Sequence, residues 1–348
     1  MNELARIPAP GERVALKHGA GGRAMRELIA GIFLAGVEDR PGEIGPRAMD
    51  DGAALPLGDG TFLVLTTDSH VVQPAFFPGG DIGRLAVCGT VNDLAMMGAT
   101  EPLALTCAVV IEEGFPRAAL ERVWSSIREA CAESRARIVT GDTKVMGHGE
   151  IDGIVLNTAG VAFTGRPVPD SGLSVGDRII VTGTIGDHGL AVLAARNDLA
   201  LEGDLRSDVA PINGLVRAAL AAGGDSIVAM KDPTRGGLSS ALHEMAGKAA
   251  VGIVLEEAAV PLSAPVRAAS EVLGIDPLIV ANEGKAVIGV RAGAAGAVLA
   301  ALRAHPQGRD AAIVATCVAE RPGRVVLDTG FGARLLPEPE GEPLPRIC

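Results

Sequence analysis

Residues 49–98 read MDDGAALPLGDGTFLVLTTDSHVVQPAFFPGGDIGRLAVCGTVNDLAMMG, and this stretch predicts the architecture of the first half of the chain. Its β-branched run FLVLTT predicts a strand that delivers Asp68 at its end. The segment that follows predicts a helix with Asp93 near its end, and Asp51 lies in the turn before the strand. Three carboxylates are therefore expected at the ends of separate elements.

The expected elements continue through residue 163. Residues 102–111 predict a buried strand, and Pro116 occupies a position where proline favours the start of a helix. Residues 138–140 predict a strand ending in Gly141-Asp142-Thr143-Lys144. One such Asp is most simply a cap or turn former. Several together would form the cluster of hard oxygen ligands that Mg²⁺ prefers, and spacing alone leaves both readings open.

A proline- and glycine-rich stretch, residues 165–172, predicts a linker between two domains. After it, strands and helices alternate again. Asp232-Pro233-Thr234 predicts a strand-to-helix corner that faces an anion, because proline keeps Asp232 out of the helix. Glu283 follows an apolar run and is either a solvated turn residue or a carboxylate aimed into a cleft.

The expected fold class is α/β (α+β), with two domains and a tail. The predicted boundaries are 1–168 for the N-terminal domain, 169–330 for the C-terminal domain and 331–348 for a flexible, proline-rich tail. The 48% hydrophobic content and 46 glycines suit tightly turned domains with real cores.

Charge and composition exclude several classes of function. The net charge of 31 − 42 = −11 repels phosphodiester backbones and anionic lipids, and with no Tyr and one Trp there are few rings to stack on bases. No run of 18 uncharged apolar residues occurs, and charges interrupt the N-terminus where a signal peptide needs an apolar core. We therefore expect a cytoplasmic protein that binds neither nucleic acid nor membranes.

The two ends of the chain carry further candidate sites. Gly21 and Gly22 belong to a glycine-rich turn whose free N–H groups could close over phosphates, although such a cluster is usually just a turn. The chain ends on Cys348, behind a segment in which prolines alternate with glutamates. Such a spacer is extended, so the twelve residues after Leu336 could carry the thiol about 37 Å (12 × 3.1). The alternative is that this proline-rich segment is simply a frayed chain terminus.

Five motifs in this order resemble a known superfamily: Asp-Asp-Gly-Ala, Thr-Asp-Ser, Asn-Asp-Leu-Ala, Gly-Asp-Thr-Lys and Asp-Pro-Thr-Arg-Gly-Gly. They resemble the aminoimidazole-ribonucleotide-synthetase-like (PurM-like) ATP-using proteins. With the terminal Pro-Arg-Ile-Cys, the chain is most similar to the HypE family of hydrogenase maturation factors. The resemblance covers essentially the whole chain.

The resemblance implies a homodimer of two-domain subunits that converts an S-carbamoyl group on the terminal cysteine to S-cyanide at the expense of ATP. A HypF-type carbamoyltransferase would load the cysteine, and a HypC–HypD complex would accept the cyanide. Cys348 would be the covalent carrier, with Lys144 and Glu283 at the reacting centre. The residues expected around Mg²⁺–ATP are Asp51, Asp68 and Asp93 for the metal, and Gly21, Gly22, Asn92, Asp93, Asp142 and Thr234 for the nucleotide.

Three other functions remain open at this level. Selenophosphate synthetase resembles the chain in its aspartates but carries a catalytic Cys or selenocysteine near the N-terminal glycine loop, which Gly19–Gly22 lacks. Thiamine-phosphate kinase has no need of a cysteine arm. A non-catalytic thiol carrier would have no use for the aspartates or for Lys144.

Overall fold

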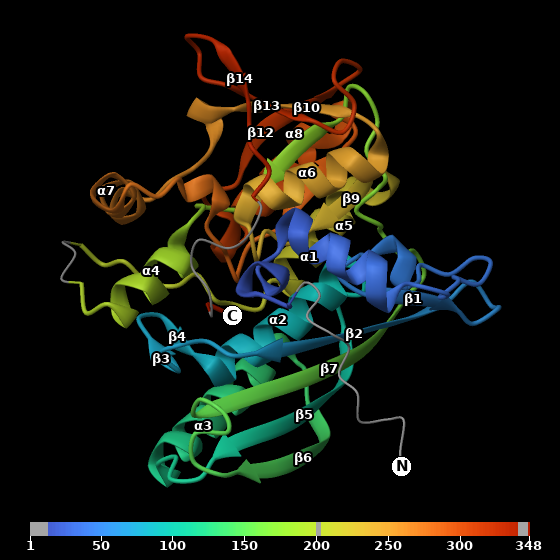
Figure 1. The fold of residues 1–348 in the computed structure, drawn as a ribbon. Helices are drawn as coiled ribbons and strands as arrows, with labels where there is room; N and C mark the ends of the chain where they lie inside the picture. Colours follow the sequence, from blue (N-terminus) through green and yellow to red (C-terminus); the bar gives the residue numbers. More distant parts are fainter. Residues whose placement is uncertain (1–12, 200–202, 340–346) are drawn as a thin grey trace.

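The computed structural model describes residues 13–199, 203–339 and 347–348, which form two halves built on separate sheets (Figure 1). The lower half in this view contains the first sheet and the upper half the second. Between them lie the helices α1 and α2, and the chain end marked C is beside α2 rather than at the rim of the molecule.

The first sheet has the strand order β1-β2-β7-β5-β6 and is antiparallel except for the β5–β6 pair. Its strands are β1 (Ala53–Pro56), β2 (Phe62–His70), β5 (Pro102–Glu112), β6 (Ile138–Met146) and β7 (Ile154–Thr164). A separate two-stranded ribbon joins β3 (Phe76–Phe77) to β4 (Gly80–Asp81). The sheet is covered on one face by α2 (Ile82–Met96), which packs on β2 and β7 and in turn against α3 (Arg117–Ser134).

The helix α2 begins and ends where its sequence allows. The Asp81 carboxylate caps it by accepting hydrogen bonds from the N–H groups of Gly83 (2.8 Å) and Arg84 (3.0 Å). The chain leaves the helix at Gly98, whose φ of 82° is in the left-handed region. Almost every residue of α2 is buried, because the helix lies between the first sheet and the second half.

The second sheet has the order β14-β13-β10-β12-β8-β11-β9. Its strands are β8 (Arg178–Val181), β9 (Ile227–Lys231), β10 (Gly252–Glu256), β11 (Val287–Val290), β12 (Ala312–Val318), β13 (Val325–Asp328) and β14 (Ala333–Leu335). The remaining α-helices are α1 (Gly22–Leu28), α4 (Asp187–Arg196), α5 (Asn213–Gly223), α6 (Gly237–Ala249), α7 (Ala264–Leu273) and α8 (Ala295–Ala304). The two-domain α/β expectation is confirmed, and none of the described helices is long and apolar enough to cross a membrane.

Two expectations about element ends need correction. The Gly-Asp-Thr-Lys motif does not follow a short strand but lies within β6, since the parallel pairing with β5 continues to Met146. The predicted tail also begins too early. Residues 333–335 form β14, which pairs with β13, and Leu336 is buried at 3% exposure, so the chain is still part of the second half there.

Candidate active site

The carboxylates expected at element ends meet between the two halves. Asp51 lies just before β1, Asp68 lies in β2 and Asp93 in α2. The Thr66 hydroxyl lies between two of these residues, 2.9 Å from the backbone oxygen of Asp51 and 2.9 Å from Oδ2 of Asp93. The backbone N–H of Asp232, which follows β9, donates to Oδ2 of Asp51 at 3.3 Å. The site is therefore assembled from both halves of the chain.

Negative charge accumulates in this buried site. Burial and the neighbouring carboxylates of Asp232, Asp68 and Asp51 raise the pKa of Asp93 well above its usual range. Burial and Asp51 likewise raise the pKa of Asp232 to about 8. Carboxylates that raise one another's pKa values in this way form a site that a cation would stabilise.

The side-chain positions, unlike the accumulated charge, do not form a complete metal site. In the part of the chain that the structure describes, no three His, Cys, Asp or Glu side chains lie together as a metal ion would require. Asp51, Asp68 and Asp93 interact electrostatically, but they do not surround a common point. Their hard oxygen atoms and shared charge suit Mg²⁺, and side-chain movement would be needed to complete the coordination.

The position of Asp51 is fixed by a buried lysine that the sequence reading missed. Lys231, the last residue of β9, places Nζ 2.8 Å from Oδ1 of Asp51, 3.3 Å from Glu244 and 3.4 Å from Asp170. Burial alone would lower the pKa of Lys231, but these carboxylates raise it well above its usual value. Lys248 shares Asp170 at 2.6 Å. Such a network holds Asp51 in place because removing one partner would leave a buried charge unpaired.

Glu283 has the properties of a poised acid or base. It is 4% exposed, and its Oε1 atom has no hydrogen-bond partner in the described structure. Burial, followed by the charges of Asp232 and Asp68, raises its pKa well above the usual range. A buried carboxyl group with an unused oxygen and a raised pKa is the pattern of a catalytic general acid–base. The solvated-turn alternative does not fit this burial.

Arg235 connects this carboxylate cluster to the end of the chain. Its pKa is raised chiefly by the negative charge of Cys348 and also by Asp68 and Glu283, although burial acts in the opposite direction. Arg235 is the residue directly after Thr234 in the Asp-Pro-Thr-Arg-Gly-Gly motif. The sequence analysis singled out this strand-to-helix corner, but it assigned nucleotide binding there to Thr234 and not to Arg235.

The last two residues of the chain are docked between the halves. Ile347 is 1% exposed and belongs to the hydrophobic core of the first half, and Cys348 is partly buried against the same core. The Val71 N–H donates to the backbone oxygen of Cys348 at 3.2 Å. His188 Nε2 lies 2.6 Å from the Ile347 carbonyl oxygen. The alternative of a frayed terminus therefore does not fit Ile347 and Cys348, since the isoleucine anchors the chain end.

The hydrogen bonds of His188 define its tautomer. A carbonyl oxygen can only accept, so Nε2 must carry the proton that is donated to Ile347. The Ser207 hydroxyl, 2.7 Å from Nδ1, supplies the second interaction. Burial lowers the pKa of His188, which favours the neutral ring. No motif of the sequence analysis included His188, and the structure places it against the chain end.

Two of the expected nucleotide-binding residues, Asn92 and Thr234, make hydrogen bonds within the protein. Asn92 is 2% exposed, and its amide bonds the backbone of Ala210 (3.1 Å), Glu283 (3.0 Å) and Ile212 (2.8 Å). It joins the two halves through both amide hydrogens and the amide oxygen, and that oxygen can accept one further hydrogen bond, so its role in nucleotide binding stays a prediction. The Thr234 hydroxyl donates to Oδ1 of Asp232 at 3.3 Å.

The glycine loop packs against protein rather than facing open space. A Cβ atom on Gly21 would lie 2.7 Å from the Arg235 carbonyl oxygen, and one on Gly22 would lie 2.3 Å from that of Pro339. Both residues have positive φ values, 77° and 71°. Glycine is thus required here by close approach of Arg235 and the tail, whatever the loop binds.

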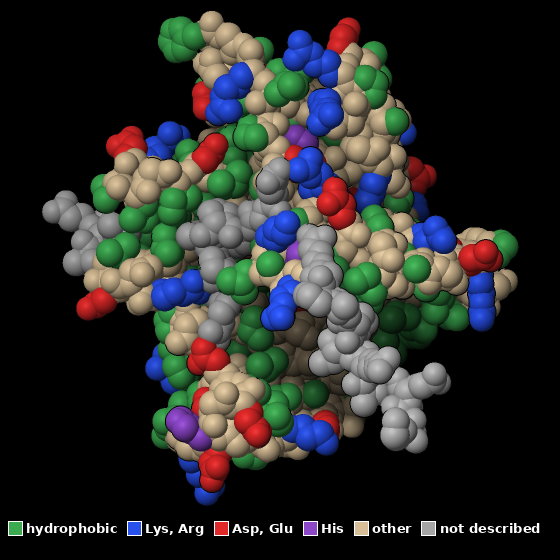
Figure 2. All heavy atoms as spheres, viewed as in Figure 1, with side chains coloured by type: hydrophobic (Ala, Val, Ile, Leu, Met, Phe, Trp, Pro, Cys, Tyr) green, Lys and Arg blue, Asp and Glu red, His purple; other side chains and the backbone are tan. Residues whose placement is uncertain are grey.

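One face of the molecule carries basic side chains. Figure 2 shows several Lys and Arg side chains around the centre of the face that carries α1. Asp51, Asp232 and Glu283, by contrast, are each less than one tenth exposed.

Comparison with known proteins identifies the family. Residues 49–164 match the N-terminal domain, and residues 174–328 the C-terminal domain, of the AIR synthase related proteins. The chain is 47% identical over 340 residues to the protein named carbamoyl dehydratase HypE from Rhodobacter capsulatus, covering 97% of this chain and 98% of the relative. The chain belongs to the HypE family.

Two solved HypE structures have the same fold. HypE in a HypE–HypF complex has a TM-score of 0.83 and 42% identity, covering 90% of this chain and 99% of that one. A hydrogenase maturation protein HypE in complex with ATP has a TM-score of 0.79 and 41% identity, covering 96% and 99%. Within the family, then, HypE proteins have been seen with ATP and with HypF.

Two expected residues lie apart from this HypE-type site. In the sheet register Asp142 and Lys144 are paired with Ala108 and Val110, on the face that α2 does not cover. They lie beside each other (3.5 Å) with side chains 63% and 68% exposed. Asp68 is on the opposite face. Within one chain, therefore, Lys144 does not form the expected pair with Glu283.

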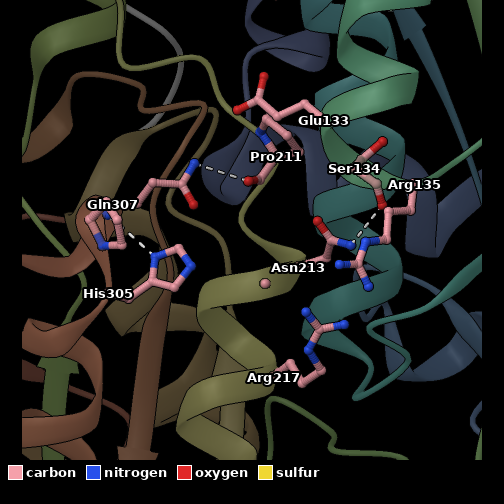
Figure 3. Close-up of a pocket in the computed structure, with 10 residues that line it drawn as sticks. Glu133, Ser134, Arg135, Pro211, Asn213, Arg217, His305 and Gln307 are labelled. Atoms are coloured by element: carbon pink, nitrogen blue, oxygen red, sulfur yellow. Dashed lines mark hydrogen bonds between the residues drawn. The ribbon is translucent and has the colours of Figure 1, made fainter.

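A separate cavity lies away from these carboxylates. It has a volume of about 390 Å³ and lies between the end of α3 and the start of α5, with Arg135, Arg217 and His305 among its lining residues (Figure 3). Polar groups form hydrogen bonds across this junction, and Asn213 Nδ2 donates to the Ser134 carbonyl oxygen at 3.0 Å. None of the carboxylates described above lines the cavity, so it is not part of this site.

Proposed function

We propose that this protein dehydrates a carbamoyl group carried on its own Cys348 to a thiocyanate, using ATP, and so supplies cyanide ligands for the iron of [NiFe]-hydrogenase. The observation that carries the proposal is the docked chain end: Cys348 lies where its charge acts on Arg235, which also interacts with Glu283. A substrate attached to that sulfur would be delivered to the buried acid–base group. Family membership supports the same reaction class.

The reaction is balanced without an added oxidant or reductant. The carbamoyl oxygen leaves with the transferred phosphoryl group as inorganic phosphate, two protons leave the carbamoyl nitrogen, and the products are S-cyanide and ADP. Glu283 is the candidate to accept a proton, since its raised pKa makes it a stronger base and its Oε1 atom is free. Arg235 is placed to stabilise negative charge near the sulfur.

Mg²⁺ would neutralise phosphate charge when bound. We assign Asp51, Asp68 and Asp93 as its ligands, with the Lys231 ammonium, 2.8 Å from Asp51, holding that carboxyl group in place. The mutually raised pKa values of the carboxylates support this assignment, because a cation would relieve the repulsion that causes them.

A second copy of the chain would account for Lys144. The uncovered face of the first sheet carries exposed apolar side chains, including Leu65 (37%) and Phe163 (47%), and Lys144 lies on the same face. Apolar exposure of this kind is typical of an interface. We propose a homodimer through this face, in which the partner subunit's Lys144 completes the site that contains Glu283.

Subunit complementation tests this arrangement. Lys144→Ala and Glu283→Gln should each be inactive alone. A heterodimer of the two retains one site with both residues only if they come from different subunits, so random mixing should restore about a quarter of the wild-type activity (half of the dimers, one of two sites). No recovery on mixing would place the pair within one subunit or remove it from the chemistry.

Intact-mass analysis tests the overall function. After incubation with a HypF-type carbamoyltransferase, carbamoyl phosphate and ATP, Cys348 should gain a carbamoyl mass and then lose one water. Cys348→Ala should show neither change while still binding ATP. We expect a HypC–HypD complex to accept the cyano group, and expect all these partners to meet in the cytoplasm. Label found on another cysteine would contradict the carrier role.

A further inference from the structure

The base of the tail is fixed to the body of the protein before the arm begins. The Leu336 side chain is 3% exposed in the core of the second half, and its N–H donates to the Val325 carbonyl oxygen at 2.9 Å. The Ser239 hydroxyl, on α6, donates to the Pro337 carbonyl oxygen at 3.0 Å. The chain is therefore held by a core contact and two hydrogen bonds at this point.

An arginine of α1 holds the next residue. Arg26 forms an ion pair with Glu338 through Nη2, and its Nη1 lies 3.2 Å from Oε1 of Glu244. The three side chains are 25%, 21% and 15% exposed, respectively. Burial alone would lower the pKa of Arg26, but the hydrogen bond with Glu338 raises it. A partly buried, shared ion pair of this kind is stronger than an exposed one.

The first residues of α1 contact the carbonyl oxygen of Pro339. The Gly22 Cα hydrogen faces the Pro339 carbonyl oxygen so closely that a Cβ atom would lie 2.3 Å from it. The Arg23 N–H donates to the same oxygen at 3.4 Å. This N–H is in the first turn of the helix, where it has no intrahelical acceptor, so the tail satisfies a group that the helix leaves free.

We propose that Gly22, Arg23 and Arg26 form a clamp that holds the chain at Glu338–Pro339, so that the carrier arm pivots after Pro339. The arm is then nine residues long (348 − 339 = 9) and reaches about 28 Å (9 × 3.1) when extended. A pivot after Leu336 would instead give about 37 Å. The proposal rests on the proposed function only in calling the arm a carrier.

The clamp has a physical consequence for delivery. A tethered thiol has an effective concentration that depends on tether length, and extra slack lowers it. Fixing the pivot therefore defines both which sites Cys348 can reach and how often it visits them. Because Glu244 also pairs with Arg26, the arginine keeps a partner if Glu338 is changed.

The experiment measures reach in the absence of partners and of ATP. Residues are deleted one at a time from 340–346, and the reaction rate of the Cys348 thiol with DTNB reports whether the tip still docks. The other four cysteines are buried, so the signal comes from the tip. Ile347→Asp, which places a charge in the core, gives the rate of an undocked tip.

The clamp predicts a shift in the deletion length at which the thiol becomes as reactive as in Ile347→Asp. Glu338→Ala and Arg26→Ala free residues 338–339, while Ser239 still holds the Pro337 carbonyl oxygen, so docking should survive up to two further deletions (339 − 337 = 2). Arg334→Ala, an exposed arginine of β14, should leave the threshold of the wild-type chain unchanged. The same threshold in the wild-type and Glu338→Ala series would overturn the clamp.

This outcome is independent of the proposed function. The assay uses the unmodified thiol, so a protein that never carries a carbamoyl group would still show the shift. Conversely, an unshifted threshold would rule out a pivot after Pro339 but would not contradict the proposed dehydration at Cys348. Glu338→Ala changes the tail alone, so a folding failure of Arg26→Ala would not prevent the test.

Discussion

Truncating Ile347, next to the terminal cysteine, should release the chain end without unfolding the protein. Ile347 is 1% exposed, and its main-chain oxygen is bound by His188. Unlike an internal core residue, it lies at the end of the chain, so the chain end can leave its pocket when the contact is weakened. We therefore expect Ile347→Ala to raise the undocked fraction while the melting temperature falls little.

The magnitude follows from the apolar volume removed. Ile347→Ala deletes three buried carbons, worth about 0.8 kcal/mol each, or about 2.4 kcal/mol in total. At about 1.4 kcal/mol per tenfold change, the undocked fraction should rise by up to about 50-fold. Ile347→Val deletes one carbon and should give about a fourfold rise. The two variants thus form a graded series at one position.

The rate of DTNB reaction with Cys348 measures this fraction, and its ceiling is the rate of a free thiol. Val272→Ala, at a position that is 74% exposed, is the matched control and should leave the rate unchanged. Equal rates for the wild type and Ile347→Ala would refute the reasoning, because they would mean that Ile347 does not hold the tip.

Three further predictions concern the site and its thiols. Asp93→Ala should weaken Mg²⁺-dependent ATP binding while the fold is retained, and calorimetry showing unchanged affinity would remove Asp93 from the site. Glu283→Gln keeps the shape of the side chain but loses the basic group, so it should still be carbamoylated on Cys348 and lose dehydration by at least about 100-fold, measured as cyanide release. Burial raises the pKa of Cys88 above its usual range and that of Cys317 to about 12, so alkylation between pH 7 and 9 should modify Cys348 and spare both. Mass mapping of either buried thiol under native conditions would contradict the last prediction.

Several features of the active site were readable from local sequence. Asp51, Asp68 and Asp93 were expected at the ends of separate elements, with a shared cluster as one of two alternatives, and in the structure the charges of Asp51 and Asp68 act on Asp93. The sequence left two alternatives for Glu283, a solvated turn residue or a carboxylate in a cleft, because an apolar run followed by an acidic residue fits both. Only burial beside Asp232 decides between these alternatives.

Other features depend on which face of an element a residue occupies. Lys144 belongs to the Gly-Asp-Thr-Lys motif, which the sequence placed at the end of a strand. Pairing with β5 extends this strand, and Lys144 then lies on the face of the sheet opposite to that of Asp68. Asn92 and Asp93 are adjacent on α2, yet one side chain bonds the backbone of the second half and the other points to the carboxylates. A change of one residue in register or helical phase reverses such assignments.

The sequence by itself determined the two-domain α/β architecture, the carboxylates available for a cation and the presence of a terminal thiol, because strand and helix periodicity, turn residues and composition are local properties. Only the tertiary structure decided that Lys231 neutralises Asp51, that Arg235 and His188 receive the chain end, and that the arm begins after Pro339. Each of these contacts joins residues more than a hundred positions apart in the sequence. Their formation depends on how two sheets and the helix between them pack, which no local pattern encodes.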